Sequence, residues 1–310
     1  MDDDLPPLPT LPITSQETLR KCRELPVGDK DIFIASFPKS GTTWMQNIVF
    51  QLVSASVHQD DNLPLDHISQ YAPFFEIDAH WESSSSDGPP QMISKIRDAH
   101  KALGYRIFNT HLRWGMLPKG PGTRYIYVVR DGRDTLTSFY HHMSNQHPDD
   151  GGFQGDFEAF FQQFLDGTIA YGKWSHHLAS WMPHCSTAAN ANANPQILLV
   201  RYEDLKQDRK QEIVRIAKFL QVDIDANNQA FMDRVLERTS FEWMREHQGL
   251  FHPISVRWKP GYNFIRKGSV GDHDSLFDEE HRKQFLDTVT KDLGGANHVP
   301  TWLHEYCFHK

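Results

Sequence analysis

The sequence predicts an α/β fold in which helices flank a central parallel sheet. Short apolar runs rich in β-forming residues alternate with helical patterns, polar residues follow each run, and no repeat or long linker divides the 310 residues. A chain of this length can bury one large core. We therefore expect one domain over residues 31–310, preceded by an extended arm over residues 1–30, which are rich in proline and charge.

The first expected strand is Asp31–Phe37, a continuous apolar run typical of a buried parallel strand. Pro38 and Gly41 interrupt it. A helix is predicted next, because apolar residues recur at helical spacing. These residues are Trp44, Met45, Ile48, Val49, Leu52 and Val53.

Three further strands are expected at residues 106–109, 125–129 and 197–200, and each is followed by polar residues. In an open parallel sheet, ligands bind at this carboxyl edge. Late helices are indicated by two sets of apolar residues, and turn-rich loops are expected at 83–90, 145–156 and 186–195. The helical sets are Ile213, Ile216, Ala217 and Leu220, then Phe285, Val289 and Leu293.

Composition excludes some classes of function. The formal net charge of −8 argues against a broad nucleic-acid surface, which needs a basic face. Three cysteines without paired spacing favour a reducing compartment. We find neither a secretion signal nor an apolar stretch long enough to cross a membrane, so we expect a cytoplasmic protein.

The segment Phe37–Trp44 (FPKSGTTW) is the strongest functional signal. A glycine between a buried strand and a helix lets the backbone approach an anion, and the free N–H groups of the first helical turn point toward it. Lys39 adds charge, while Thr42 and Thr43 add hydroxyl donors. A Walker A loop would place its lysine after the last glycine, whereas here the lysine precedes it. The alternative is an ordinary strand-to-helix turn.

This segment resembles the PKSGTTW loop of the cytosolic-type sulfotransferase family, which uses 3′-phosphoadenosine 5′-phosphosulfate (PAPS). Tyr125–His141, with Arg130 and Ser138, resembles the family's 3′-phosphate segment, and residues 266–272 (RKGSVGD) resemble its RKGxxGD signature. Residues 202–204 and 239–244 are similar to two further nucleotide segments. The resemblance implies a P-loop NTPase-like sulfotransferase fold and transfer of a sulfonate from PAPS to a hydroxyl, or an amine, of a small molecule.

The resemblance also implies nucleotide-binding residues in three groups. One group holds the 5′-phosphosulfate, one holds the 3′-phosphate, and one contacts adenine. They are Lys39, Ser40, Gly41, Thr42 and Thr43 for the first; Arg130, Ser138, Arg266, Lys267 and Gly268 for the second; and Trp44, Tyr202, Thr239, Phe241 and Met244 for the third. Two separate anion sites match the two charged ends of PAPS.

His111 is the expected general base, because the Thr110-His111-Leu112 motif matches the family's catalytic motif and histidine titrates near neutral pH. Lys39 is expected to stabilise charge on the leaving phosphate, which requires no metal. The resemblance implies that Ser138 keeps Lys39 away from the bridging oxygen of PAPS until an acceptor is present. The chain departs from the family at Asn109, where a lysine is usual, so that position brings a hydrogen-bond donor without charge.

Aromatic and histidine side chains are expected to line the acceptor pocket. They are Phe74, Phe75, Trp81, Trp114, Phe139 and His142, and their alternative role is core packing. Arg113 and Trp114 replace the proline that the family commonly has after its catalytic motif. The family's dimerisation signature is absent, so we expect a monomer or a dimer with another interface.

Four other interpretations are weaker. A phosphoryl-transferring P-loop enzyme would use Asp131 as a magnesium ligand, but the sequence has no GK[ST] loop. A catalytically inactive nucleotide-binding module is disfavoured by the presence of both Lys39 and His111. A metal site at His304, Cys307 and His309 lacks a fourth ligand in sequence reach. A membrane-anchored glycan sulfotransferase would start with an anchor.

Overall fold

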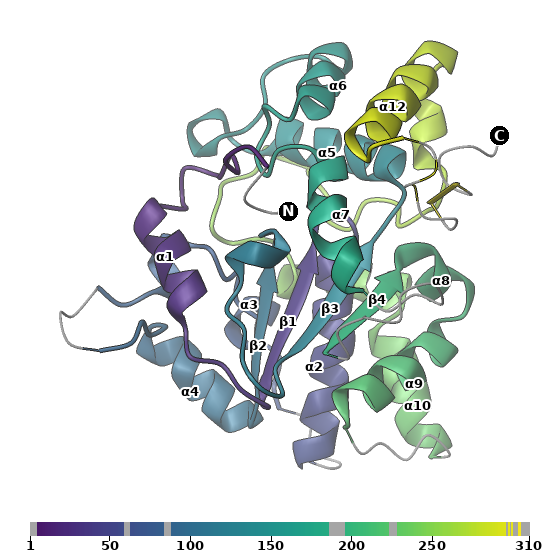
Figure 1. The fold of residues 1–310 in the computed structure, drawn as a ribbon. Coiled ribbons are helices and arrows are strands. Elements are labelled where there is room, and N and C mark those ends of the chain that lie inside the picture. Colours follow the sequence, from purple (N-terminus) through teal and green to yellow (C-terminus); the bar gives the residue numbers. More distant parts are fainter. Residues whose placement is uncertain are drawn as a thin grey trace.

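The computed structural model describes residues 5–58, 63–83, 88–185, 196–222, 228–295, 297, 299, 303 and 304. Four parallel strands form its sheet in the order β2-β1-β3-β4 (Figure 1). Their bounds are β1 Asp31–Ser36, β2 Arg106–Thr110, β3 Arg124–Val129 and β4 Ile197–Arg201. Each predicted strand is therefore confirmed to within about one residue at each end.

Side chains of β1 alternate between two hydrophobic cores, as a pleated strand requires. Ile32 and Ile34 belong to one core, whereas Phe33 and Ala35 belong to the other. All four are fully buried. This double burial explains why the strand reads as a continuous apolar run instead of alternating with polar residues.

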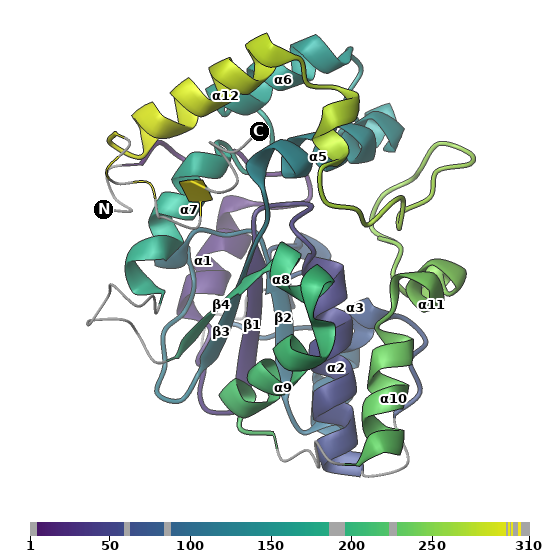
Figure 2. The ribbon, with the colours of Figure 1, turned by 90° about the vertical axis from the view of Figure 1, so that its right-hand side faces the viewer.

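Helices cover both faces of the sheet (Figure 2). The core that contains Ile32 and Ile34 is closed by α2 (Thr42–His58), α3 (Ile68–Tyr71), α9 (Arg209–Leu220) and α10 (Gln229–Arg238). The opposite core is closed by α1 (Gln16–Glu24), α5 (Gly132–Asn145), α6 (Phe157–Asp166), α7 (Trp174–Trp181) and α12 (Glu279–Asp292). Helix α4 (Ser94–Leu103) contributes side chains to both cores, and α8 (Tyr202–Gln207) and α11 (Phe241–Glu246) are short. The predicted layered α/β fold is confirmed.

The N-terminal segment corrects one expectation. Residues 16–24 form helix α1 instead of an extended arm, and the Ser15 side chain accepts the Thr18 N–H at its start. Leu19 and Cys22, three residues apart, are buried in the core that contains Phe33. The proline-rich start obscured this short amphipathic helix, which itself contains no proline.

The predicted loops are only partly described. Residues 186–195 and 84–87 lie outside the described part of the chain, whereas residues 145–156 include a 3₁₀-turn, Pro148–Asp150. Within the described segments, no helix combines the length and the apolar composition needed to cross a lipid bilayer.

Asp134 ties helix α5 to the segment that follows the RKG sequence. Its buried carboxylate accepts hydrogen bonds from Gly271 N (2.9 Å), His273 N (3.0 Å) and His273 Nδ1 (2.7 Å). Burial alone would raise the pKa of Asp134, but the His273 hydrogen bond and the Arg130 charge outweigh it and lower the pKa to about 2. This carboxylate therefore fixes residues 266–272 against α5.

We predict that Asp134→Ala lowers the free energy of unfolding by roughly 2–4 kcal/mol, since it leaves buried donors without an acceptor. A carboxylate with a depressed pKa stabilises the fold above its ordinary pKa, and this contribution disappears as pH falls through the folded value. Urea denaturation should therefore show the difference between wild type and variant shrinking from pH 4 to pH 2.

The exposed Asp287 of α12 provides the control. Asp287→Ala should change the unfolding free energy by less than about 1 kcal/mol at either pH. An equal loss in the two variants, or a loss at Asp134 that does not depend on pH, would contradict this role.

Candidate functional site

The turn between β1 and α2 has an unusual backbone. Lys39 and Gly41 both have positive φ angles, 69° and 101°. Such angles are rare outside glycine, and at Lys39 they mark a strained turn of the kind found at binding sites. The turn directs the first N–H groups of α2 toward the carboxyl edge of the sheet, where an anion can be bound.

Gly41 is required here for space as well as for conformation. A Cβ atom at this position would lie 2.8 Å from Cδ2 of Tyr202. The Tyr202 ring therefore packs directly on the turn, and it also lies edge-on to Trp44 at 5.4 Å between ring centroids. Two aromatic rings thus stand beside the anion-binding turn.

Arg130 lies on the other side of the turn, at the end of β3. Its Nη1 donates to Lys39 O (3.2 Å), its Nη2 donates to Ser269 O (3.0 Å), and its guanidinium lies 4.6 Å from the Tyr202 ring centroid. Its Nε is buried and has no partner among the described atoms. One arginine therefore connects the turn, the segment after Gly268 and the aromatic wall.

The segment 266–272 brings two more cations to the same edge. Arg266 and Lys267 both pair with Asp272, with 2.6 Å from Lys267 Nζ to Asp272 Oδ1. Gly268 has a φ of 61°, and a Cβ there would lie 2.5 Å from the Phe241 ring. The regions around Phe241, Gly268 and Arg130, which are far apart in sequence, are therefore packed together.

One cavity of about 320 Å³ joins these groups. Its described lining includes one carboxylate, Asp272, and several cations, which are Lys39, Arg130, Lys206, Arg266 and Lys267. An excess of positive charge in a cleft favours an anionic ligand. The other predicted nucleotide residues on this lining are Gly41, Thr42, Thr43, Trp44, Ser138, Tyr202, Phe241, Met244 and Gly268.

The Lys39 ammonium lies where this charge is concentrated. Burial, followed by the charges of Arg130 and Arg266, lowers the pKa of Lys39 to about 7. A bound anion would oppose the last two effects and favour the charged form. The site is therefore electrostatically incomplete without an anion.

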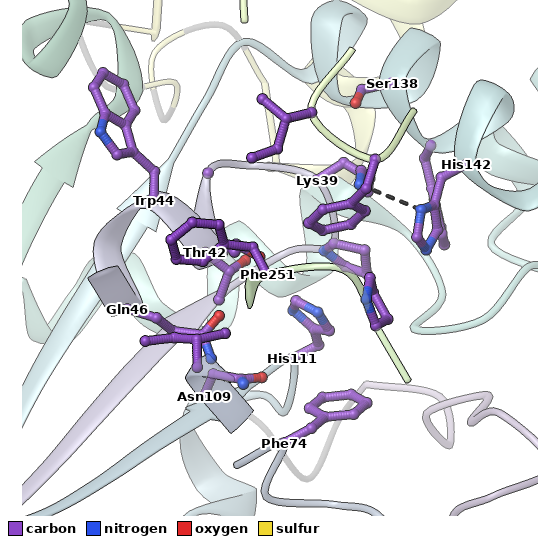
Figure 3. A pocket seen from close by; sticks show the side chains of 18 of the residues that line it. Lys39, Thr42, Trp44, Gln46, Phe74, Asn109, His111, Ser138, His142 and Phe251 are labelled. Atoms are coloured by element: carbon purple, nitrogen blue, oxygen red, sulfur yellow. Dashed lines mark hydrogen bonds between the residues drawn. The ribbon is translucent and has the colours of Figure 1, made fainter. Parts of the chain in front are cut away.

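His111 lies on the cavity lining next to Phe74 (Figure 3). Its Nδ1 lies 2.7 Å from Ser36 O, and a carbonyl oxygen only accepts, so Nδ1 carries the proton and Nε2 is the free basic nitrogen. Burial lowers the pKa of His111 to about 4 despite this hydrogen bond. The ring is therefore neutral and held in the tautomer that a base requires.

Glu76 supports the His111 segment, and sequence analysis missed it. Its Oε1 accepts the His111 N–H at 2.7 Å, and burial raises the pKa of Glu76 to about 8. Its Oε2 and the Tyr171 hydroxyl are buried and have no partners among the described atoms. The Tyr171 ring lies 5.1 Å from that of His111.

Asn109 lines the cavity at the position where the family usually has lysine. Its Nδ2 donates to Ala72 O at 2.9 Å, so the amide is fixed by the neighbouring loop. The lysines and arginines of the described cavity lining are Lys39, Arg130, Lys206, Arg266 and Lys267. Among them, Lys39 is the one whose charge helps to lower the pKa of His111.

Three predicted acceptor residues are placed elsewhere. Phe75 is fully buried in the core under the sheet, Trp81 packs against it at 5.4 Å, and Trp114 packs on Tyr125 and Trp181 away from the cavity. The prediction that these three rings face the acceptor is therefore wrong, because each fills the core that contains Phe33. Phe74, Phe139 and His142 do line the cavity.

Two predicted nucleotide residues also lie behind the lining. Ser40 is buried in the turn, and its hydroxyl has no partner among the described atoms. The Thr239 hydroxyl donates to Val235 O in the last turn of α10 (2.7 Å). The Thr239 carbonyl instead positions Trp44, because it accepts the Trp44 indole N–H at 2.8 Å. Its side chain is therefore not available to the adenine edge.

Several lining residues carried no readable signal in the sequence. Leu11 and Ile13 come from the N-terminal segment, and Gln46, His80, Tyr171 and Phe264 come from separate elements. Tyr171 has a positive φ of 70°, which residue type alone does not reveal. Residues from separate elements meet at this cavity only in the folded chain, so their spacing in the sequence does not predict that they line it.

The described residues contain no group of three potential ligands that could hold a metal ion. Cys307 and His309 lie outside the described part, and His304 Nε2 lies 3.0 Å from Val299 O. Asp131, the potential magnesium ligand of a phosphoryl-transfer enzyme, pairs with Arg133 at 2.6 Å and is absent from the cavity lining. Asp131 therefore does not support the interpretation of the chain as a phosphoryl-transfer enzyme.

Comparison with known proteins agrees with the motifs. The family model for a sulfotransferase domain matches residues 29–297. Sulfotransferase 1B1 of Mus musculus is 31% identical over 274 residues, which cover 86% of this chain and 83% of the mouse protein. Sulfotransferase 1A1 of Mus musculus is 27% identical over 289 residues, with 91% and 90% coverage.

Solved structures agree on the fold. Mouse sulfotransferase SULT7A1 complexed with PAP has a TM-score of 0.68 at 24% identity. The match covers 94% of this chain and 95% of the mouse chain. Retinol dehydratase in complex with androsterone and PAP has a TM-score of 0.66 at 20% identity, with 91% and 86% coverage. The turn at Lys39, the Arg130 segment, the RKG segment and the extent of the match together show that this chain belongs to the sulfotransferase family.

Proposed function

We propose that the chain transfers a sulfonate group from PAPS to a hydroxyl, or an amine, of a small molecule and releases adenosine 3′,5′-bisphosphate (PAP). The observation that carries this proposal is the single cavity that joins the anion-binding turn, the Arg130 and RKG cations and the neutral His111. The 5′-phosphosulfate would lie at the N-terminus of α2, and the 3′-phosphate would lie near Arg130 and residues 266–268.

In the transfer step, the acceptor oxygen attacks sulfur while the bond from sulfur to the bridging phosphate oxygen breaks. His111 Nε2 accepts the hydroxyl proton, and Ser36 O keeps the opposite nitrogen protonated throughout. Negative charge that develops on the leaving phosphate is stabilised by Lys39 and by the N–H groups of α2. His111 thus supplies acid–base catalysis, and Lys39 supplies electrostatic stabilisation of the leaving group.

The acceptor end of the cavity favours a neutral, partly aromatic molecule. Its lining combines apolar rings with polar groups of low charge, since burial lowers the pKa values of His80, His111 and His142. A charged acceptor would lie there without a partner, which is unfavourable. Screening phenols, aliphatic alcohols, amines and sugars with ³⁵S-labelled PAPS would identify the acceptor class.

We predict that His111→Ala lowers sulfonate transfer by roughly 10²–10⁴-fold, because it removes the nitrogen that Ser36 O holds in the proton-accepting tautomer. Affinity for PAP, measured by calorimetry, should stay within about threefold, since His111 does not touch the cationic groups. The control is His281→Ala on α12, which lies outside the cavity lining and should retain transfer. Normal turnover in His111→Ala would remove this residue from the mechanism.

We also predict that affinity for PAP falls as pH rises above about 7. The free protein then loses the charge of Lys39, whose pKa is about 7, and binding must restore that proton. The dissociation constant should increase by up to about tenfold per pH unit until the pKa of the bound state is reached.

The matched variant is Lys39→Arg, which stays charged over this range. Its dissociation constant for PAP should be nearly constant from pH 7 to pH 9. If wild type and Lys39→Arg showed the same pH dependence, Lys39 would not be the group that titrates.

A further inference from the structure

Two side-chain amides lie next to each other on the cavity lining, Gln46 of α2 and Asn109 of β2 (Figure 3). Gln46 Nε2 lies 2.7 Å from Ala72 O, and Asn109 Nδ2 lies 2.9 Å from the same oxygen. A carbonyl oxygen only accepts hydrogen bonds, so each amide turns its nitrogen toward Ala72 and its oxygen away from it. The shared carbonyl therefore fixes the orientation of both amides.

The elements that carry the two amides are themselves well fixed. Asn109 forms two backbone hydrogen bonds with the segment that contains Ala72, one from Phe75 N (2.8 Å) and one to Pro73 O (3.0 Å). Gln46 is buried, with 4% of its surface exposed. Two oriented amides on rigid elements form a preorganised pair of hydrogen-bonding groups, which a ligand can use at little entropic cost.

The oxygens of the two amides are available to a ligand. Among the hydrogen bonds between described residues, none uses Gln46 Oε1 or Asn109 Oδ1. Neither oxygen is among the described buried atoms that lack a partner, so each has some surface exposed to the cavity. An amide oxygen only accepts hydrogen bonds, and this pair therefore requires donors on the ligand.

Neighbouring polar groups at the start of α3 use their donors within the protein. His67 Nε2 lies 2.8 Å from His252 O, so this nitrogen carries the proton. His67 Nδ1 accepts the Ser69 N–H at 3.2 Å and also lies 2.7 Å from the Ser69 hydroxyl, which therefore donates to it. Both His67 and Ser69 line the cavity. This polar side of the lining thus presents mainly acceptor atoms to a ligand.

The amide oxygens lie on the same cavity as the proposed base. Asn109 and His111 are two residues apart at the end of β2, so their side chains leave the backbone in the same direction, and both line the cavity. An acceptor whose hydroxyl meets His111 Nε2 therefore brings its neighbouring atoms toward the amide oxygens.

We propose that Gln46 and Asn109 select acceptors that carry a second hydroxyl group, which donates to their amide oxygens while the first hydroxyl meets His111. This inference rests on the proposed sulfonate transfer and names a substrate class for that site, a neutral diol or diphenol. A monohydroxy acceptor would displace water from both oxygens and give them no donor, which is unfavourable. A lysine at position 109, which is usual in the family, would offer a donor there instead of an acceptor.

The test compares acceptors that differ by one hydroxyl group. Phenol is compared with catechol, resorcinol and hydroquinone, and cyclohexanol is compared with the cyclohexanediols. The measured quantity is the preference ratio, which is kcat/KM for the best dihydroxy compound divided by that for its monohydroxy partner, corrected for the number of hydroxyl groups. Calorimetry on the PAP-bound protein gives the corresponding ratio of affinities in a complex that cannot react.

The variants are made in the full-length chain. Gln46→Leu and Asn109→Leu each remove one amide oxygen, and Asn109→Lys replaces the acceptor by a donor. Gln51→Leu is the matched control, because Gln51 also lies on α2 but outside the described cavity lining, and it donates to Asn47 Oδ1 at 3.3 Å. Thermal melting and calorimetry with PAP show whether each variant is folded and binds nucleotide.

We expect a preference ratio of about ten in wild type, the size that one or two hydrogen bonds give. Gln46→Leu and Asn109→Leu should each lower it to about three or less, Asn109→Lys should abolish the preference, and Gln51→Leu should keep it. A purely structural role for the amides would lower kcat/KM equally for both members of a pair and leave the ratio unchanged.

A ratio close to one in wild type would overturn the proposal, and so would a ratio that stays at the wild-type value in folded Gln46→Leu and Asn109→Leu variants. Turnover of monohydroxy acceptors alone would have the same meaning. Failure of the proposed function itself is a different result, because wild type would then bind no PAP and would transfer sulfonate to no acceptor of the panel.

Discussion

The whole arrangement depends on one electrostatic constraint, the concentration of positive charge at the carboxyl edge of the sheet. Lys39, Arg130 and Arg266 lie close enough for the two arginines to lower the pKa of the lysine, and Asp272 is the single carboxylate on the described cavity lining. Such a cluster is unfavourable by itself, and an anion with two charged ends relieves it. The fold tolerates this local cost because its remaining elements fix the cluster. Buried Asp134 ties residues 271–273 to α5, and Arg130 connects the turn to Ser269.

The same edge also places the reacting groups. Strand β1 ends at Ser36, whose carbonyl fixes the His111 tautomer and whose hydroxyl lies 2.6 Å from that of Thr42 at the start of α2. One residue at the end of a fully buried strand therefore connects the base to the anion-binding turn. Glu76 restrains the base from the opposite side through the His111 N–H. Geometry of this kind lets modest side-chain chemistry act on a bound sulfonate.

Sequence reasoning was most reliable where local physics determines the structure. Continuous apolar runs predicted the four strands, and the Lys39–Gly41 turn predicted an anion site, because glycine, helix start and lysine are adjacent in the chain. It was weakest for the acceptor end. Phe75 and Trp81 point into the core, whereas their neighbour Phe74 faces the cavity, and residue type does not encode this difference in side-chain direction. The contacts made by Glu76, Tyr171 and His142 arise from segments far apart in sequence, so only the folded chain reveals them.

The central claim is that two separate clusters hold the two charged ends of one nucleotide, and four dissociation constants test it most directly. Calorimetry with PAP and with adenosine 5′-monophosphate, on wild type and on Arg130→Ala, isolates the interaction between Arg130 and the 3′-phosphate. We predict that the substitution weakens binding of PAP by roughly 10- to 100-fold and binding of the monophosphate by less than about threefold. This difference is expected because the charge-assisted hydrogen bonds to the 3′-phosphate are lost. Equal weakening of both ligands would mean that Arg130 acts only through the shape of the site, and would contradict the account.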